Sequence, residues 1–255
     1  MTHNKVIKTA AGIRIDAVAL GLLLLLPVVR AWAAPGRLAV GERLEYEVTY
    51  GPASAGTAVL TIADTTSFRG RTCYVLRSAA QSNRFFSTFY RVDDRAESLL
   101  DVDRLVSLRF EKHIREGKHS LDETIYFDPD RRWVFYPGGE IYETPPRVQD
   151  VLSALYLVRL DSLRAGLTFQ LNNHTDNRNY PMEVTVSDRV TVRVPAGEFD
   201  CWVLRPMLRT AGLFKHSGEI TVYVTADERN MPVLMKTKVF IGSVAAQLVS
   251  YRTGG

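Results

Sequence analysis

Arg43-Leu-Glu-Tyr-Glu-Val-Thr-Tyr50 is the stretch of sequence that shows the fold class most directly. Leu44, Tyr46, Val48 and Tyr50 fall on one face of an extended segment, and charged or hydroxyl side chains fall on the other. Side chains alternate across a strand, so this pattern predicts a β-strand with one buried face. Such one-sided alternation is typical of antiparallel sheets, because parallel sheets are usually covered on both faces.

The same alternation recurs over Val190–Val194 and Ile220–Val224, and turn residues such as Glu116-Gly117 and Pro137-Gly138-Gly139 separate the apolar runs. We therefore expect roughly ten strands joined by short turns.

One segment has a helical period instead. Apolar residues recur every three or four positions over Val148–Leu163, which predicts an amphipathic helix. Pro145-Pro146 suits its entry and Gly166 its exit, and Asp150 is placed to cap its first turn. The apolar stripe predicted to pack on the sheet is Val151, Leu152, Leu155 and Val158.

The fold class that these patterns favour is mainly β: a single curved antiparallel sheet or incomplete barrel, with one packed helix near residues 148–163. Curvature toward closure is one way in which such sheets protect their edges. A two-sheet sandwich is the alternative.

The first 33 residues differ in composition from the rest. Three cations precede the apolar run Ala17–Val29, and Ala31-Trp32-Ala33 follows as a small-x-small cleavage pattern. The apolar run is shorter than the ~20 residues that cross a bilayer. We expect residues 1–33 to be a signal peptide and residues 34–255 to be a single exported β domain without a transmembrane span.

Charge argues against a nucleic-acid partner. The formal net charge is +4, but residues 1–33 hold four cations and one acid, so the rest of the chain is close to neutral.

Cys73 and Cys201 are the two cysteines of the chain. An oxidising compartment would permit a disulfide between them, and two separate buried thiols are the alternative. Both lie in a Cys-aromatic-Val-Leu-Arg pentad, ending at Arg77 and Arg205. Two related β halves would explain this echo, and so would chance similarity between strands.

Several short stretches occur together in a suggestive order: Tyr46-Glu-Val-Thr-Tyr-Gly51, Gln149-Asp-Val-Leu-Ser-Ala-Leu-Tyr156, Val194-Pro-Ala-Gly-Glu-Phe199, Thr225-Ala-Asp-Glu-Arg229 and Ile241-Gly-Ser243. This order resembles a bacterial exported family known only as a domain of unknown function, over about Gly41–Arg252. The resemblance implies a bacterial envelope location, the periplasm in particular, and no catalytic residues. Half-barrels of the lipoprotein-carrier kind offer a distant architectural analogy.

The chain shows no nucleophile elbow, phosphate loop, dinucleotide fingerprint or zinc-protease motif, so we expect no cofactor and no catalytic residues. His113 and His119 flank the Glu116-Gly117 turn. A two-residue loop there would point them to opposite faces, so we expect no metal site.

Aromatic residues concentrate in the first half of the mature chain. Phe85-Phe86-Ser-Thr-Phe89-Tyr90 would place apolar groups on both faces of a strand, and a second apolar face must be buried or must line a cavity. Ordinary core packing is the alternative. The candidate ligand-binding residues are Phe85, Phe86, Phe89, Tyr126, Trp133 and Trp202.

These observations predict a non-catalytic envelope protein that binds an apolar or lipid-like ligand on the concave face of its sheet. A structural or assembly factor that binds another envelope protein is the first alternative. A periplasmic enzyme with an unrecognised site is the second.

Overall fold

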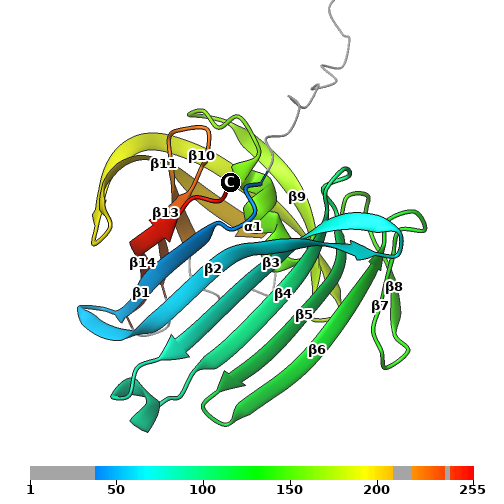
Figure 1. Ribbon diagram of the computed structural model, residues 1–255, viewed down its shortest axis with the longest axis horizontal. Helices are drawn as coiled ribbons and strands as arrows, with labels where there is room; N and C mark the ends of the chain where they lie inside the picture. Colours follow the sequence, from blue (N-terminus) through cyan, green and yellow to red (C-terminus); the bar gives the residue numbers. More distant parts are fainter. Residues whose placement is uncertain (1–37, 209–219, 239–241) are drawn as a thin grey trace, which may run out of the picture. The chain divides into compact units, whose positions relative to one another are not determined.

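The structure is a computed structural model that describes residues 38–208, 220–238 and 242–255. In these residues fourteen strands form one antiparallel sheet, with one α-helix packed against it (Figure 1). The predicted signal peptide, residues 1–33, lies outside the described residues. The strands are β1 (Arg43–Tyr50), β2 (Ala53–Phe68), β3 (Arg71–Ser82), β4 (Asp93–Asp101), β5 (Ser107–Glu116), β6 (His119–Asp128), β7 (Trp133–Phe135), β8 (Ile141–Glu143), β9 (Thr168–Thr175), β10 (Arg178–Val194), β11 (Gly197–Leu208), β12 (Ile220–Thr225), β13 (Pro232–Lys238) and β14 (Ser243–Arg252).

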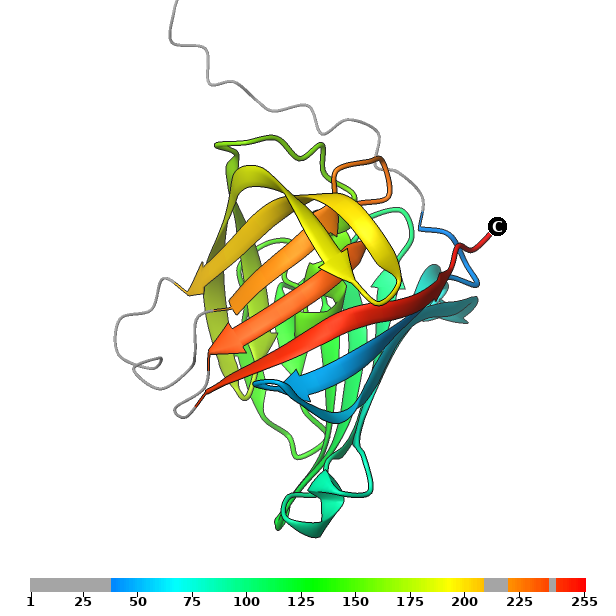
Figure 2. The ribbon, with the colours of Figure 1, turned by 90° about the vertical axis from the view of Figure 1, so that its left-hand side faces the viewer.

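Across the sheet the strands follow the order β8-β7-β6-β5-β4-β3-β2-β1-β14-β13-β12-β11-β10-β9. Each half is a meander in which neighbours in sequence pair, and the pairing of β1 with β14 joins the halves. The sheet curves so that α1 (Val151–Arg159) lies on its concave side, as Figures 1 and 2 show. The predicted curved antiparallel sheet with one packed helix is confirmed, and the sandwich alternative is wrong.

The two cysteine-containing strands occupy equivalent positions in the two halves. Cys73 lies opposite Asp101, and Cys201 lies opposite Thr225. The backbone N–H of Asp101 donates to the carbonyl of Val106 at 3.0 Å, and that of Thr225 donates to the carbonyl of Met231 at 2.9 Å. The residue before each accepting residue has a positive φ: 51° at Leu105 and 42° at Asn230. The echo in the sequence therefore corresponds to a structural repeat, β3–β5 and β11–β13.

Both cysteines are buried free thiols, so the disulfide that the sequence left open is not formed in this structure. Cys201 belongs to the main core cluster, whereas Cys73 packs with Val75 and Leu99 in a small separate cluster. Burial raises the pKa of each thiol to about 11, which keeps both of them protonated and unreactive.

The helix is shorter than the sequence predicted, and it is buried on more sides. It begins at Val151 and ends at Arg159, so Pro145-Pro146 and Gly166 lie outside it. The predicted apolar stripe was partly wrong, because Val151 is 53% exposed. Ser153 and Arg159 are buried instead, because Ser107 of β5 and Glu42, just before β1, give them polar partners.

Asp150 caps the helix from a fully buried position. Its carboxylate accepts from the backbone N–H groups of Leu152 and Ser153, both at 2.8 Å, and from the hydroxyls of Ser98 and Ser107 at 2.6 and 2.8 Å. Burial raises the pKa of Asp150, while the hydrogen bonds from Ser98 and Ser153 act in the opposite direction. Ser98 and Ser107 lie in β4 and β5, so one side chain ties the start of the helix to two strands.

An ion pair secures the other end of the helix. The Arg159 guanidinium donates from both terminal nitrogens to the two carboxylate oxygens of Glu42, at 2.7 and 2.6 Å, and both side chains are buried. Glu42 directly precedes β1. The pair therefore joins the helix to the strand at which the two halves of the sheet meet.

Side chains bridge the gap between the two free edges of the sheet, β8 and β9. A 3.0 Å hydrogen bond joins the Tyr136 hydroxyl, just past β7, to Nε2 of His174 in β9. Nδ1 of His174 contacts the Asn179 amide oxygen at 2.8 Å, and Asn179 donates to the carbonyl of Glu143 in β8. His174 is fully buried, and this burial lowers its pKa.

We expect Asp150→Ala to lower the free energy of unfolding by about 2–4 kcal/mol, because it removes a helix cap and leaves two buried serine hydroxyls short of a partner. Asp150→Asn keeps the accepting oxygen for the helix N–H groups and should cost about 1 kcal/mol. Urea denaturation of both variants measures the difference. Equal midpoints for Asp150→Ala and the wild type would contradict the anchoring role of this side chain.

We expect the bridge at His174 to weaken in acid. A lowered pKa means that the unfolded chain binds the proton more readily than the native chain. The contribution of His174 is therefore complete above the ordinary histidine pKa of about 6.5 and is lost as the pH falls through the lower native value. Thermal unfolding between pH 7.5 and about pH 5 should show a smaller loss of stability for His174→Gln than for the wild type. If the stability of the wild type and of His174→Gln falls equally over this pH range, His174 is not the group that titrates.

Candidate functional site

The concave face holds an apolar recess between α1 and the second half of the sheet. Its volume is about 140 Å³. The helix contributes Val151, Leu155 and Val158, and the facing strands β10, β11 and β12 contribute Met182, Leu204 and Val222, among others. Apolar cavities of about 150 Å³ stay dry and take up small apolar molecules. A recess of this size therefore suits a slender apolar group better than a bulky ligand.

A second apolar recess, of about 160 Å³, lies on the same face over β1 to β5 and β13. Its walls include Ile114, Met235 and four alanines, which are Ala58, Ala79, Ala80 and Ala96. Short side chains leave room above a sheet that larger ones would fill. Each of these alanines is only partly buried, so the floor of the recess is accessible.

The two recesses are neighbours across one pair of strands. Val222 of the first lies directly opposite Met235 of the second in the β12–β13 register. Side chains that are directly opposite in antiparallel strands share a face and lie ~5 Å apart at Cβ. The concave face thus presents a band of accessible apolar surface from α1 to β3 that is wider than either recess alone.

One carboxyl group, that of Asp94, lines the second recess, and a second lies beside it. Asp94 also accepts from the backbone N–H of Arg115 at 2.8 Å. Partial burial and the neighbouring Asp94 carboxyl raise the pKa of Glu116, at the end of β5. The rim can therefore hydrogen-bond a polar group while the interior contacts an apolar one.

The structure separates the six predicted ligand-binding residues, and none of them lines either recess. Phe85, Phe86 and Phe89 do not form a strand. They lie in the connection between β3 and β4, around a short 3-10 helix, η1 (Phe86–Thr88), where Phe85 is 67% and Phe89 76% exposed. The strand expected over this stretch was wrong, and a ligand-binding role for these residues stays a prediction.

The other three predicted residues also lie elsewhere. Tyr126 is stacked on Phe135, and Arg69 lies over both rings, on the face away from the core residue Phe127. Trp133 is 45% exposed on β7. Trp202 lines a separate hollow of about 770 Å³ near the end of α1, beside Leu160.

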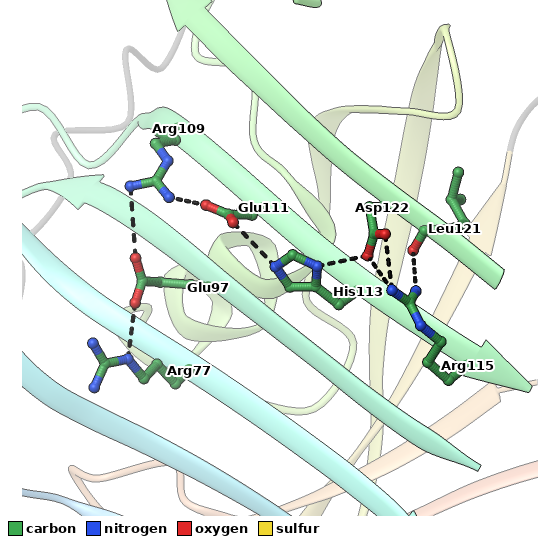
Figure 3. A network of polar contacts seen from close by, with 8 residues as sticks. All are labelled: Arg77, Glu97, Arg109, Glu111, His113, Arg115, Leu121 and Asp122. Atoms are coloured by element: carbon green, nitrogen blue, oxygen red, sulfur yellow. Dashed lines mark hydrogen bonds and ion pairs between the residues drawn. The ribbon is translucent and has the colours of Figure 1, made fainter. Parts of the chain in front are cut away.

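The face of the sheet away from α1 carries a ladder of charged side chains, drawn in Figure 3. Glu97 pairs with Arg77 at 2.8 Å and with Arg109 at 3.8 Å. His113 contacts Glu111 at 3.0 Å and Asp122 at 2.7 Å. The ladder lies under an open hollow of about 760 Å³ that further arginines also line.

The register of the β5–β6 hairpin explains the position of His113. Gly117 and Lys118 form the two-residue turn, so the turn lies one residue later than predicted, and His113 lies opposite Asp122. His119 pairs with Glu116 and therefore points to the other face, as expected of a two-residue loop. Hydrogen bonds from His113 and Arg115 lower the pKa of Asp122.

Mutual pairing limits what the ladder can do chemically. Its charges compensate one another on a solvated surface, where ion pairs are each worth about 0–1 kcal/mol. In the part of the chain that the structure describes, no cluster of three or more His, Cys, Asp or Glu side chains is arranged to hold a metal ion. The ladder is best explained as cross-strand charge pairing that stabilises the sheet.

A solved structure has a similar fold. The β-barrel-like protein of the DUF1849 domain of unknown function from Brucella abortus is 13% identical, with a TM-score of 0.58 over 86% of this chain and 99% of that chain. This similarity shows a shared fold, which in this chain is a single curved antiparallel sheet. Residues 45–249 match the model of the family described as "protein of unknown function (DUF3108)", and the chain belongs to this family.

Two further solved structures are more distant. A protein described as exported, with a YmcC-like fold, from Bacteroides fragilis is 10% identical, with a TM-score of 0.37 over 86% of this chain and 99% of that chain. A protein described as a lipoprotein from Parabacteroides distasonis is 8% identical, with a TM-score of 0.36 over 85% of this chain and 97% of that chain. A search of curated proteins finds no match. None of the helices in the described residues is long and apolar enough to cross a membrane.

We expect Leu152→Ala and Leu155→Ala to differ in cost although they lie one turn apart. Leu152 is buried in the core, so its truncation should cost about 2–5 kcal/mol. Leu155 already borders the first recess and is only partly buried, so its truncation should cost about 1 kcal/mol. Urea denaturation midpoints provide the comparison. If Leu155→Ala costs as much as Leu152→Ala, the recess does not exist in solution.

Proposed function

We propose that this protein binds a slender apolar molecule, such as an acyl chain of a lipid, on the concave face of its sheet in the bacterial cell envelope. The single observation that carries the proposal is the pair of adjoining apolar recesses. Accessible apolar surface is costly in water, at about 25 cal/mol per Å². A ligand that covers this band recovers that cost, and ligand sites are typically concave and mostly apolar.

The rim supplies the polar half of the recognition. Asp94 lines the second recess, and the neighbouring Glu116, whose pKa is raised, interacts with Asp94. A protonated carboxyl donates a hydrogen bond, and an ionised one accepts from a hydroxyl or ammonium group. The head of an amphipathic ligand would lie at this rim, with its chain directed toward α1. The envelope location is part of the proposal and is supported by the basic and apolar composition of residues 1–33.

Titration of delipidated protein with an environment-sensitive fluorescent fatty acid tests this proposal. Val222→Phe places a ring in the first recess, and Thr221→Phe adds the same ring to the other face of β12. We expect saturable binding by the wild type. We also expect at least about tenfold weaker binding by Val222→Phe, a loss of about 1.4 kcal/mol, because the ring occupies the space of the ligand. Thr221→Phe should change binding little.

Two outcomes would contradict the proposal. One is a wild-type protein that gives no saturable signal. The other is an equal loss of binding in the two variants, because the signal would then not come from the concave face.

A further inference from the structure

The connection between β3 and β4 carries an exposed aromatic surface, here called the aromatic tip and defined as residues 84–91. Phe85, Phe89 and Tyr90 are 67%, 76% and 51% exposed. The rings of Phe85 and Phe89 meet edge to face at 5.4 Å, and Phe86 joins Phe85 at 5.8 Å. Single exposed apolar side chains are common on protein surfaces, but a contiguous group of aromatic rings marks an interaction site.

Hydrogen bonds hold the aromatic tip in this conformation. The Asn83 side chain accepts from the backbone N–H of Phe86 at 2.9 Å. The Ser87 hydroxyl donates to the carbonyl of Asn83 at 2.7 Å, and the Thr88 hydroxyl donates to that of Phe85 at 2.7 Å. The rings are therefore displayed on a preorganised turn, which lowers the entropy cost of binding.

Cations flank these rings. Arg84 and Arg91 are exposed at either end of the aromatic tip, and Lys118 is exposed in the adjacent β5–β6 turn. The neighbouring acids are engaged: Glu116 accepts from the Tyr90 hydroxyl, and Asp93 pairs with Arg91 and Arg95. Aromatic rings with flanking arginines match the interface of a bilayer, where rings lie at headgroup level and cations meet anionic lipids.

The aromatic tip also adjoins the mouth of the second recess. Ala80 and Asp94 line that recess and lie opposite each other in the β3–β4 register. Ala80 is two residues from Ser82, where β3 ends, a span of ~7 Å along a strand. In Figure 1 this connection, with its short helix, lies at the lower left, where β3 ends and β4 begins.

We propose that the aromatic tip is a membrane-docking surface, which inserts Phe85 and Phe89 into the interface of a bilayer containing anionic phospholipid. The flanking arginines contact the phosphate groups, and the protein binds peripherally through this end of the sheet. Docking here brings the open end of the concave face to the lipid surface. The assignment stands on the aromatic tip alone and does not require the recesses to bind a ligand.

Co-sedimentation with vesicles of phosphatidylcholine, with and without phosphatidylglycerol, tests the proposal. The double variant Phe85→Ser/Phe89→Ser removes the two most exposed rings. We expect its partition coefficient on anionic vesicles to fall at least about tenfold. Arg84→Gln/Arg91→Gln should lower binding to anionic vesicles by about fivefold for each cation, with little effect on phosphatidylcholine alone.

The matched control is Trp133→Ser/Ile141→Ser, which removes two exposed apolar side chains from β7 and from the edge strand β8. It should bind vesicles as the wild type does. A wild type that stays in the supernatant with both vesicles overturns the proposal. Equal losses in the aromatic-tip and control variants overturn it as well. If a tip-dependent crosslink in intact cells then captures a protein instead of lipid, the surface belongs to a protein partner.

The fatty-acid titration separates this proposal from the proposed function, because it is done without vesicles. Phe85→Ser/Phe89→Ser should keep the affinity of the wild type for the probe. Val222→Phe should keep vesicle binding. Circular dichroism and the urea midpoint show whether the double aromatic-tip variant is folded. If it is folded as the wild type is and still loses both activities, the two sites are not separate.

Discussion

The attachment of α1 to the concave face is the constraint on which the rest of the structure depends. A nine-residue helix is too short to be stable alone in water, so the strands around it must hold it. They do so with a buried carboxylate at one end, Asp150, and a buried ion pair at the other, Arg159 with Glu42. Buried polar groups are tolerated only when they are satisfied, so these contacts fix the position and the orientation of the helix. They also select one curvature of the sheet, because their partners come from strands that are far apart in sequence.

One short helix cannot fill the concave face of a fourteen-stranded sheet. It packs against β3, β4 and β9 and faces β10–β12 across the first recess. The accessible apolar band follows from this arrangement: its location is set by the anchors of α1, and its depth by the alanines of β2, β3 and β4. The side-chain bridge at His174 closes part of the gap between the sheet edges where backbone pairing does not.

Period-two alternation was enough to predict the antiparallel sheet, and a helical period was enough to place the centre of α1. Asp150 was predicted as a cap from its position alone, but its burial was not, because Ser98 and Ser107 lie more than forty residues away. The apolar character of the candidate site was predicted from the sequence, but its lining residues were not. Large aromatic side chains drew attention, whereas the recess is lined by alanine, valine and methionine, whose role depends on the register of β12 with β13. The spacing of Phe85, Phe86 and Phe89 was a usable signal against a strand.

The central claim is that the concave face holds an apolar ligand, and native mass spectrometry of protein purified without detergent from its native source tests it most directly. The account predicts that part of the population carries a non-covalent adduct with the mass of a lipid or fatty acid. It also predicts that Val222→Phe, expressed and purified in the same way, lacks that adduct. A wild-type spectrum that shows only the unliganded chain, under conditions in which a known lipid-binding protein keeps its ligand, would contradict the claim.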